Sequence, residues 1–194
     1  MTSRAEQRER TRRTLLRVSR ELFADRGYGA VGLAEVVAAA GVTKGALYHH
    51  FAGKAELFGA VLAEVQREVG ERVAGAADAE AGAWDGLVAG CGAFLAAATA
   101  PDVRRIMLLD GPAVLGWARW RALDEEASAR HLADALTELV REGTLAPQPV
   151  APLARLLSGA MNEAALWLAE SEDPGRDLAD TRAALGRLLE SLRA

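Results

Sequence analysis

The amino-acid sequence predicts an all-α protein. Along most of the 194 residues, apolar side chains recur at the spacing of one helix face. Glycine and proline interrupt these runs at points where helices commonly end. No stretch shows the strict apolar–polar alternation of a half-buried strand. With 51% hydrophobic and 26% charged residues, the chain has enough apolar surface to build a core.

Four helices are expected in the first third of the chain. Gly27 ends the first, and Gly41 ends the second at a point where the chain needs left-handed backbone. Thr43 is placed to cap the third helix with its side-chain oxygen. The expected helices cover residues 8–26, 33–40 and 44–51, and the fourth begins at Lys54.

The remainder is also expected to be helical. Residues 70–82 are rich in glycine, alanine and aspartate, which predicts a hinge between an N-terminal and a C-terminal unit. Further helices are expected over residues 84–99, 103–109, 114–141, 152–170 and 178–192. The long stretch from Val114 is expected to bend or break.

Charge is distributed unevenly, although the net charge is only −4. Residues 1–54 carry 10 Lys and Arg against 5 Asp and Glu, whereas residues 55–194 carry 13 against 22. A basic segment on an acidic body favours a dedicated DNA-facing module, because phosphate attracts the first part and repels the second. We therefore expect a DNA-binding domain over residues 1–54 and a second helical domain over residues 55–194.

Lysine occurs at two positions only, Lys44 and Lys54, on either side of a short helical segment with two histidines and a tyrosine. A short helix that carries cations, aromatic groups and small residues can enter a DNA groove. Residues 33–51 have the build of a helix-turn-helix, in which two short amphipathic helices meet at a tight turn. Leu47 and Phe51 are expected to point inward and to hold the second of these helices.

Three strings in this region are specific. They are Phe-Ala-Asp-Arg-Gly-Tyr from Phe23, Ala-Ala-Gly-Val-Thr-Lys-Gly-Ala-Leu-Tyr-His-His-Phe from Ala39, and Gly-Lys-Ala-Glu-Leu-Phe from Gly53. Together they resemble the N-terminal domain of TetR/AcrR-type transcriptional regulators, over about residues 8–65. The resemblance implies a homodimeric, all-helical repressor that binds double-stranded DNA at a palindromic operator. It also implies that a small molecule, bound in the C-terminal domain, changes the affinity for DNA.

The resemblance assigns contacts with DNA bases to one part of the third helix. Lys44 is the expected base reader, since a lysine at this position can donate to guanine O6 and N7 in the major groove. Gly45 and Ala46 permit close approach, and Ala46 can touch a thymine methyl group. His49 is placed to reach a base edge or a phosphate.

Other residues are expected to bind the DNA backbone. Thr43 can hydrogen-bond a phosphate in addition to capping the helix, and Tyr48 and His50 are also placed for phosphates. Lys54 adds its charge to the positive end of the following helix, a position that suits a phosphate.

The sequence departs from the family pattern before the second helix, where Thr or Ser is common and this chain has Val31-Gly32-Leu33. Gly32 can cap this helix only weakly, and the side-chain donor to phosphate is missing. Binding is then expected to depend more on the arginines between Arg4 and Arg17. Whether these contact phosphates or form only a solvated helix end stays open at this stage.

Two apolar stripes near the C-terminus suggest a dimer interface. The resemblance implies that the two helices pack against their mates in a second subunit, forming a four-helix seam. Both helices can also serve the core of one subunit. The stripes consist of Leu153, Leu157, Ala160, Met161, Ala164 and Leu168, and of Leu178, Thr181, Leu185, Leu188 and Leu192.

A small-molecule pocket is expected in the C-terminal domain, because its aromatic and methionine residues with few polar groups are typical of such sites. Packing alone is the competing interpretation for each of these side chains. The candidate lining residues for a small, largely apolar effector are Phe94, Met107, Trp117, Trp120, Met161, Asn162 and Trp167.

Other classes of function fit less well. Asp110, Glu163 and His131 can be drawn together as an enzyme site, but no phosphate-binding loop or nucleophile constellation accompanies them, so we expect neither catalytic residues nor a cofactor. A helical module that uses its helix-turn-helix corner for protein contacts is the other alternative. No metal site is expected, since adjacent helix residues such as His49 and His50 point about 100° apart.

The apolar runs are shorter than the ~20 residues that a membrane span needs, and no signal peptide is evident. We therefore expect a cytoplasmic protein that does not enter the membrane. Cys91 is the single cysteine, and its apolar neighbours predict a small buried side chain rather than a redox switch.

Overall fold

The computed structural model describes residues 3–194, and these are helical almost throughout. The first four helices are α1 (Arg4–Ala30), α2 (Leu33–Ala40), α3 (Lys44–His50) and α4 (Lys54–Asp78). After α5 (Ala83–Ala98) come α6 (Pro101–Arg104), a π-helical turn η1 (Arg105–Asp110) and α7 (Gly111–Leu115). The chain ends with α8 (Trp117–Glu125), α9 (Ser128–Glu142), α10 (Val150–Leu168) and α11 (Pro174–Glu190). No strand occurs in the described part, which confirms the predicted all-α class.

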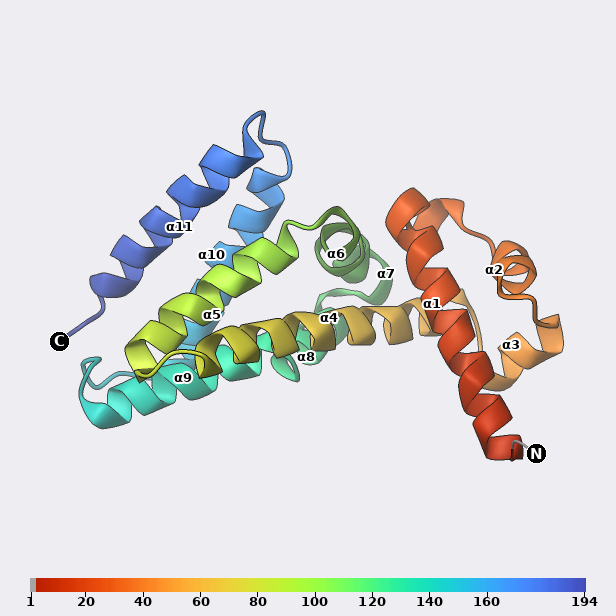
Figure 1. Ribbon diagram of the computed structural model, residues 1–194, viewed down its shortest axis with the longest axis horizontal. Helices are drawn as coiled ribbons and strands as arrows, with labels where there is room; N and C mark the ends of the chain where they lie inside the picture. The colour runs from red at the N-terminus through yellow and green to blue at the C-terminus, as the bar shows by residue number, and fades with distance from the viewer. Residues whose placement is uncertain (1–2) are drawn as a thin grey trace.

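The molecule is elongated, with two bundles joined by one long helix (Figure 1). Helices α1–α3 form a small unit at one end, here called the head (residues 3–53). The other helices form the body (residues 54–194), in which α11 lies at the end opposite the head (Figure 1). Helix α4 begins beside α1 and continues between the body helices, so it carries the head on a rigid arm.

The head has its own apolar core. Leu15, Leu16 and Phe23 of α1 are buried together with Val36 of α2 and Leu47 of α3. The core continues into α4, where the Phe58 ring meets the rings of Phe23 and Tyr28 edge-on, with centroids 5.3 and 5.2 Å away. Edge-on pairs suit the quadrupoles of the rings, so they fix the start of α4 against α1.

Two glycines shape the head, and Gly41 does so as its position predicts. Gly41 ends α2 in the left-handed region (φ 64°, ψ 31°), which places α3 across α2. Gly27 has φ 76° and makes a kink rather than an end, because α1 resumes for three residues up to Ala30. A Cβ at Gly27 would lie 3.1 Å from the Arg105 guanidinium, so η1 packs directly against this kink.

The predicted hinge at residues 70–82 is wrong, since α4 continues as helix through Asp78. Its small residues allow helices to pack closely instead. A Cβ on Gly86 of α5 would lie 3.1 Å from the carbonyl oxygen of Ala77, and one on Gly70 would lie 3.4 Å from the backbone of Ser128. Glycine therefore brings α5 and α9 against α4, and no flexible joint separates the units here.

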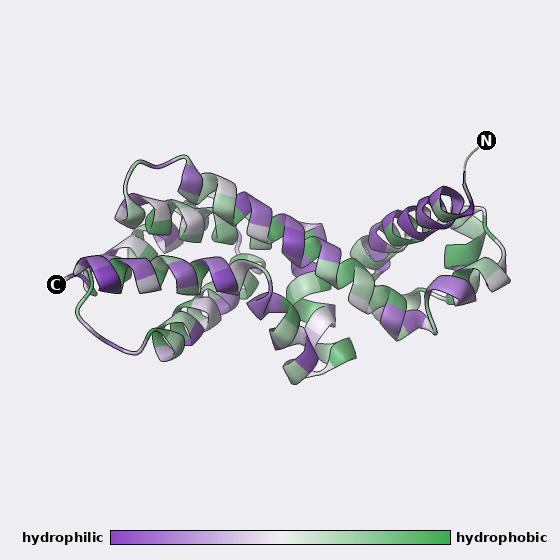
Figure 2. Ribbon diagram, turned by 90° about the horizontal axis from the view of Figure 1, so that it is seen from below, coloured by the Kyte–Doolittle hydropathy of each residue, from purple (hydrophilic) through white to green (hydrophobic). Residues whose placement is uncertain are grey.

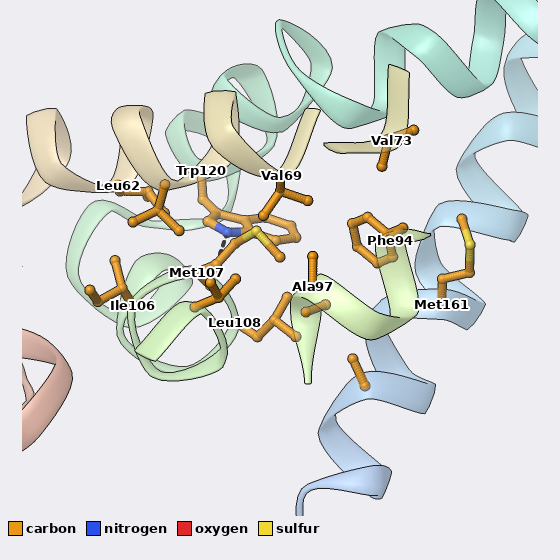
Figure 3. Packing of buried hydrophobic residues seen from close by; sticks show 14 of the residues in the cluster. Leu62, Val69, Val73, Phe94, Ala97, Ile106, Met107, Leu108, Trp120 and Met161 are labelled. Atoms are coloured by element: carbon orange, nitrogen blue, oxygen red, sulfur yellow. Dashed lines mark hydrogen bonds between the residues drawn. The ribbon is translucent and has the colours of Figure 1, made fainter. Parts of the chain in front are cut away.

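The single helix expected over residues 114–141 is interrupted twice. Gly116 (φ 76°) separates α7 from α8, and Ala127 separates α8 from α9. Trp120 explains the local arrangement, because its indole N–H donates to the carbonyl oxygen of Met107 at 2.7 Å (Figure 3). A Cβ on Gly111 would lie 2.8 Å from the same ring. Trp120 thus fixes η1 and α7 to α8.

The two apolar stripes predicted near the C-terminus lie mainly inside the subunit. Leu157, Met161 and Leu168 of α10 are buried, and Leu178 and Leu185 of α11 pack against the same core. A different set of apolar residues is exposed on these helices. This outer face consists of Leu156, Gly159, Ala160 and Trp167 on α10 and of Ala184 and Leu188 on α11.

Candidate nucleic-acid interface and effector cavity

One side of the short helix α3 packs against the head core, and the opposite side is exposed to solvent. Thr43 caps it, with the side-chain oxygen accepting the Ala46 N–H at 3.1 Å. Leu47 is fully buried and Phe51, which follows the helix, is nearly so, as the sequence predicts. The two residues attach α3 to the head core, so the opposite side of the helix faces outward.

The side chains predicted to contact DNA lie on that outward side. Lys44, Gly45, Tyr48 and His49 are exposed, while Ala46 and His50 are half-buried. The Lys44 ammonium lies 5.9 Å from the centroid of the Tyr48 ring, one turn along the helix. The structure therefore presents a cation, an aromatic hydroxyl and the His49 imidazole to solvent on this helix.

Lys54 lies at the start of α4, where its ammonium sits 4.0 Å above the centroid of the Tyr28 ring. Such a cation–π contact holds the charge near the head surface. Gly32 precedes helix α2 and gives it no side-chain cap, as the sequence predicts.

The arginine-rich start of α1 is helical from Arg4 and is closed by a capping box between Ser3 and Glu6. Figure 2 shows hydrophilic residues along this first part of α1. Arg13 and Arg17 pair with glutamates of the same helix, whereas Arg8 and Arg12 have no ion pair within residues 3–194. These two arginines lie close enough to His50 to influence its charge.

The pKa of His50 lies below its ordinary value, because of burial first and of the nearby Arg8 and Arg12 second. His50 is therefore neutral near pH 7 in the free protein. A phosphate placed beside it would raise this pKa again, so DNA binding would take up a proton.

Consequently, we expect the affinity for specific DNA to rise as the pH falls from 7.5 to about 6, by about tenfold at most for each histidine. Binding isotherms measured at constant ionic strength would show this dependence, and His50→Gln should flatten it. A wild-type affinity that stays constant over this interval would contradict the predicted phosphate contact.

A cavity lies in the body between α4, α5, α9 and α10. It contains about 440 Å³ of space not filled by atoms, part of it open to solvent. Phe94 and Met161, two of the residues predicted to contact an effector, line it, and Figure 3 labels both side chains. Cys91 also lines it, and burial raises the pKa of this thiol to about 12, so the thiol stays protonated.

The seven residues predicted to line one pocket do not lie together. Met107 is buried in the core, where its carbonyl oxygen accepts from Trp120. Trp117, Trp120 and Asn162 line a separate surface hollow between α8 and α10. Trp167 is 53% exposed on the outer face of α10. Helical spacing identifies apolar residues but does not distinguish a cavity wall from core or from an interface, because all three need the same side chains.

Sequence reasoning missed a buried polar network at one side of the cavity. The guanidinium of Arg121 donates to the Asp124 carboxylate at 2.8 Å and to the Ser158 hydroxyl at 3.0 Å. Ser128 donates to the same carboxylate at 3.2 Å. The Arg-x-x-Asp spacing places both charges on one face of α8, but similar pairs occur on exposed helices and only the packing buries this one.

Head and body meet through specific polar contacts. The Asp110 carboxylate accepts the backbone N–H of Tyr28, just after the kink of α1, at 2.8 Å. Arg20 of α1 donates to both oxygens of Glu68 at 2.7 Å and contacts Asp102 at 3.3 Å. The head is thus bonded both to the arm α4 and to the α6–η1 segment.

Family models match both parts of the chain. Residues 15–61 match the model described as bacterial regulatory proteins of the tetR family, and residues 84–192 match the tetracyclin repressor-like C-terminal domain. A crystal structure of a TetR-family transcriptional regulator from Pectobacterium atrosepticum is 38% identical and has a TM-score of 0.79. The match covers 100% of this chain and 98% of that one. The chain belongs to the TetR family. It is accordingly a transcriptional regulator with a DNA-binding helix-turn-helix and a ligand-binding C-terminal domain, and not an enzyme.

Two curated relatives of this TetR-family chain match over about a third of its length. The HTH-type transcriptional activator FasR of Mycolicibacterium smegmatis is 47% identical over 68 residues, which are 35% of this chain and 30% of the relative. The HTH-type transcriptional regulator AcrR of Shigella flexneri is 38% identical over 63 residues, 32% of this chain and 29% of the relative. The matches span less than a third of the relatives' length, so they do not bear on the remainder of either relative.

No single helix within residues 3–194 is both long and apolar enough to cross a membrane. Helix α5 together with α6–α7 meets the criteria of length and composition only as a pair, and this pair is bent by 83°.

Proposed function

We propose that this TetR-family regulator is a repressor that binds a near-palindromic operator as a homodimer and leaves it when a small, largely apolar effector occupies the body. The observation that carries the proposal is the exposed cationic front of α3, which the head core and the arm α4 hold in a fixed position. Two such helices would occupy successive major grooves about 34–36 Å apart.

Within this proposal, Lys44 reads base edges, with Gly45 and Ala46 allowing close approach and His49 adding a further contact. Thr43, Tyr48, His50 and Lys54 bind phosphates. Arg8 and Arg12 are added to this second group, because both lie beside His50 and neither is engaged by a carboxylate in residues 3–194. Phosphate contacts fix the position of the head, and base contacts select the sequence.

The homodimer is supported by the outer face of α10 and α11, where three large apolar side chains are exposed, Leu156 at 72%, Trp167 at 53% and Leu188 at 48%. Exposed apolar groups that follow one helix face are characteristic of an interface, because a second copy would remove them from water. This face lies in the body and leaves α3 of each subunit free.

The proposed effector site is the cavity between α4, α5, α9 and α10. Helix α4 forms one of its walls and also carries the head, so a ligand that shifts α4 would change the distance between the two α3 helices. The effector acts only if it binds more tightly to the conformer that does not fit DNA.

Selection of genomic fragments with the purified full-length protein tests the proposal, followed by gel shifts at two salt concentrations. We expect enriched fragments to share a near-palindrome with half-sites one helical turn apart, and the binding to weaken with salt. Absence of any enriched sequence would overturn the proposal. Reporter expression with and without the protein then distinguishes repression from activation.

The bond between Asp110 and Tyr28 gives a prediction about coupling. Asp110→Ala removes the only side-chain link from η1 to the backbone after the kink of α1 among the described residues. We expect the operator affinity without effector to change by less than about threefold, since one exchanged hydrogen bond contributes little. The release by effector should be weakened, because the hydrogen bond that ties η1 to the head is lost while only packing and the Arg20–Asp102 contact remain.

Operator gel shifts with increasing concentrations of the effector would measure this release. Asp134→Ala, at an exposed position on α9, is the matched control and should respond like the wild type. An Asp110→Ala variant that is released at the wild-type effector concentration would contradict the predicted coupling.

A further inference from the structure

The cavity in the body is apolar except at one side. Its walls are formed mainly by alanine, glycine, valine, leucine, phenylalanine and methionine residues of four helices. Polar side chains in its lining come from Ser128 and His131 of α9 and from Ser158 of α10. A ligand in this cavity would therefore be mostly apolar and would meet its hydrogen-bonding partners at the serine side.

The two serines are themselves parts of a buried ion-pair network. Asp124 is 3% exposed and Arg121 is 8% exposed, and both lie on α8 behind the serines. The hydroxyl of Ser128 donates to Asp124, and Arg121 donates to the oxygen of Ser158. The nearby Ser158 hydroxyl also acts to lower the pKa of the Asp124 carboxyl, against the larger effect of burial. The bonds within the network thus determine which donor and acceptor positions of the two serines remain available to a ligand.

Counting donors and acceptors shows what is left. A serine hydroxyl has one proton and two lone pairs. The Ser128 proton points to the Asp124 carboxylate, and one lone pair of Ser158 receives the Arg121 N–H. The remaining lone pairs of Ser128 and Ser158 are acceptors. A ligand complements them with a hydrogen-bond donor.

The Arg121–Asp124 network offers no unpaired charge to an ionic ligand. Arg121 is matched by Asp124 and also lies 3.6 Å from Glu125, so its positive charge is already balanced. Burial raises the pKa of the Asp124 carboxyl, with the adjacent Arg121 opposing the rise. A ligand carboxylate would face this poorly solvated anion. An ammonium would lose its hydration without gaining an unpaired partner.

On the basis of the proposed function, we propose that the effector is a neutral, largely apolar alcohol or phenol whose hydroxyl donates to the side-chain oxygen of Ser128 or Ser158. The response passes through α8, which carries Arg121 and Asp124 and also Trp120. The Trp120 indole bonds the carbonyl oxygen of Met107 in η1, and η1 ends at Asp110 beside the head. The hydroxyl of the ligand thus contacts a network on α8, and α8 is connected through η1 to the head.

The test compares ligands of similar size that differ in one group. Phenol, toluene and benzoate form one series, and hexanol, methyl pentyl ether and hexanoate form the other. Calorimetry or ligand-observed NMR on the full-length protein measures their affinities. We expect each hydroxyl compound to bind about tenfold more tightly than its isostere without a donor, as one buried hydrogen bond provides. The carboxylates should bind more weakly still.

The serines are tested with Ser128→Ala, Ser158→Ala and the double variant, with Thr137→Ala at an exposed position on α9 as the control. We expect the double variant to lose the preference for the hydroxyl compounds while it still binds toluene. Both substitutions remove only a hydroxyl group and leave Arg121 paired with Asp124, so we expect the fold to be retained. Circular dichroism checks this. The control should retain the wild-type preference.

The inference is overturned if toluene or the ether binds as tightly as the hydroxyl compound, if a carboxylate binds most tightly, or if no member of either series binds. It is also overturned if the double variant keeps the hydroxyl preference. Operator binding of the same samples without ligand is measured in parallel. Intact operator binding then shows that only the ligand class is wrong, whereas loss of sequence-specific DNA binding by the wild type refutes the proposed function itself.

Discussion

Leu156→Glu is expected to convert the protein into a folded monomer that no longer holds its operator. Leu156 is 72% exposed on α10, in line with Ala160 and Trp167 on the same face, and Leu188 extends this face on α11. A carboxylate on this face would be buried without a partner in the dimer but solvated in the monomer. The substitution therefore disfavours association and leaves the fold of one subunit intact.

The loss for DNA binding should be large, because a dimer binds its second half-site intramolecularly. Linking two binding modules in this way raises the affinity by about 100-fold to 10,000-fold. We expect Leu156→Glu to weaken operator binding by at least about 100-fold. Sedimentation at micromolar protein would show the monomer, and gel shifts would show the loss.

Leu109→Glu is the matched control, since Leu109 is similarly exposed at 49% but lies on η1 rather than on α10 or α11. This control should remain dimeric. If Leu156→Glu still sedimented as a dimer, the outer face of α10 and α11 would not be the subunit interface.

Lys44→Ala is expected to abolish most of the discrimination between operator and unrelated DNA. Lys44 begins α3, is exposed, and is the only lysine on that helix. A well-placed contact with a base edge contributes about 1–3 kcal/mol of discrimination, and a dimer makes it twice. The ratio of the two affinities should therefore fall by at least about 30-fold. Competition binding with the operator and a scrambled sequence measures this ratio.

Lys54→Ala serves as the comparison, because the Lys54 ammonium lies over the Tyr28 ring at the head surface and is proposed to bind phosphate. It should weaken binding to both DNAs to a similar extent and reduce the salt dependence. Full discrimination retained by Lys44→Ala would remove Lys44 from the base-reading role.

Much of the head was predictable from local signals. Helix α2 has the predicted ends, since Gly41 adopts the left-handed conformation that a helix end favours and a side chain with a Cβ does not. Thr43 caps α3 because its side-chain oxygen reaches a backbone N–H three residues later. Leu47 is buried because its position repeats the apolar spacing of the helix. Each of these features depends on residues within about one turn of one another.

In the body, local signals did not predict how glycine and tryptophan residues pack. Gly70 and Gly86 look like joints in the sequence, but they serve close helix packing, and only the neighbouring helix decides between the two uses. Trp120 and Trp167 have similar sequence surroundings, yet one is buried with its N–H bonded and the other is exposed on the outer face. An aromatic residue at helical spacing has no local property that distinguishes these environments.

The sequence by itself therefore determined the helices, the turn between α2 and α3 and the cationic front of α3, because local backbone preferences and side-chain types set them. Tertiary structure alone decided that α4 is one uninterrupted arm, that Leu156 rather than Leu157 faces outward, and that Arg121 and Asp124 are buried beside a cavity. These outcomes follow from how α4, α5, α8, α9 and α10 meet, since burial depends on neighbours that lie far away along the chain.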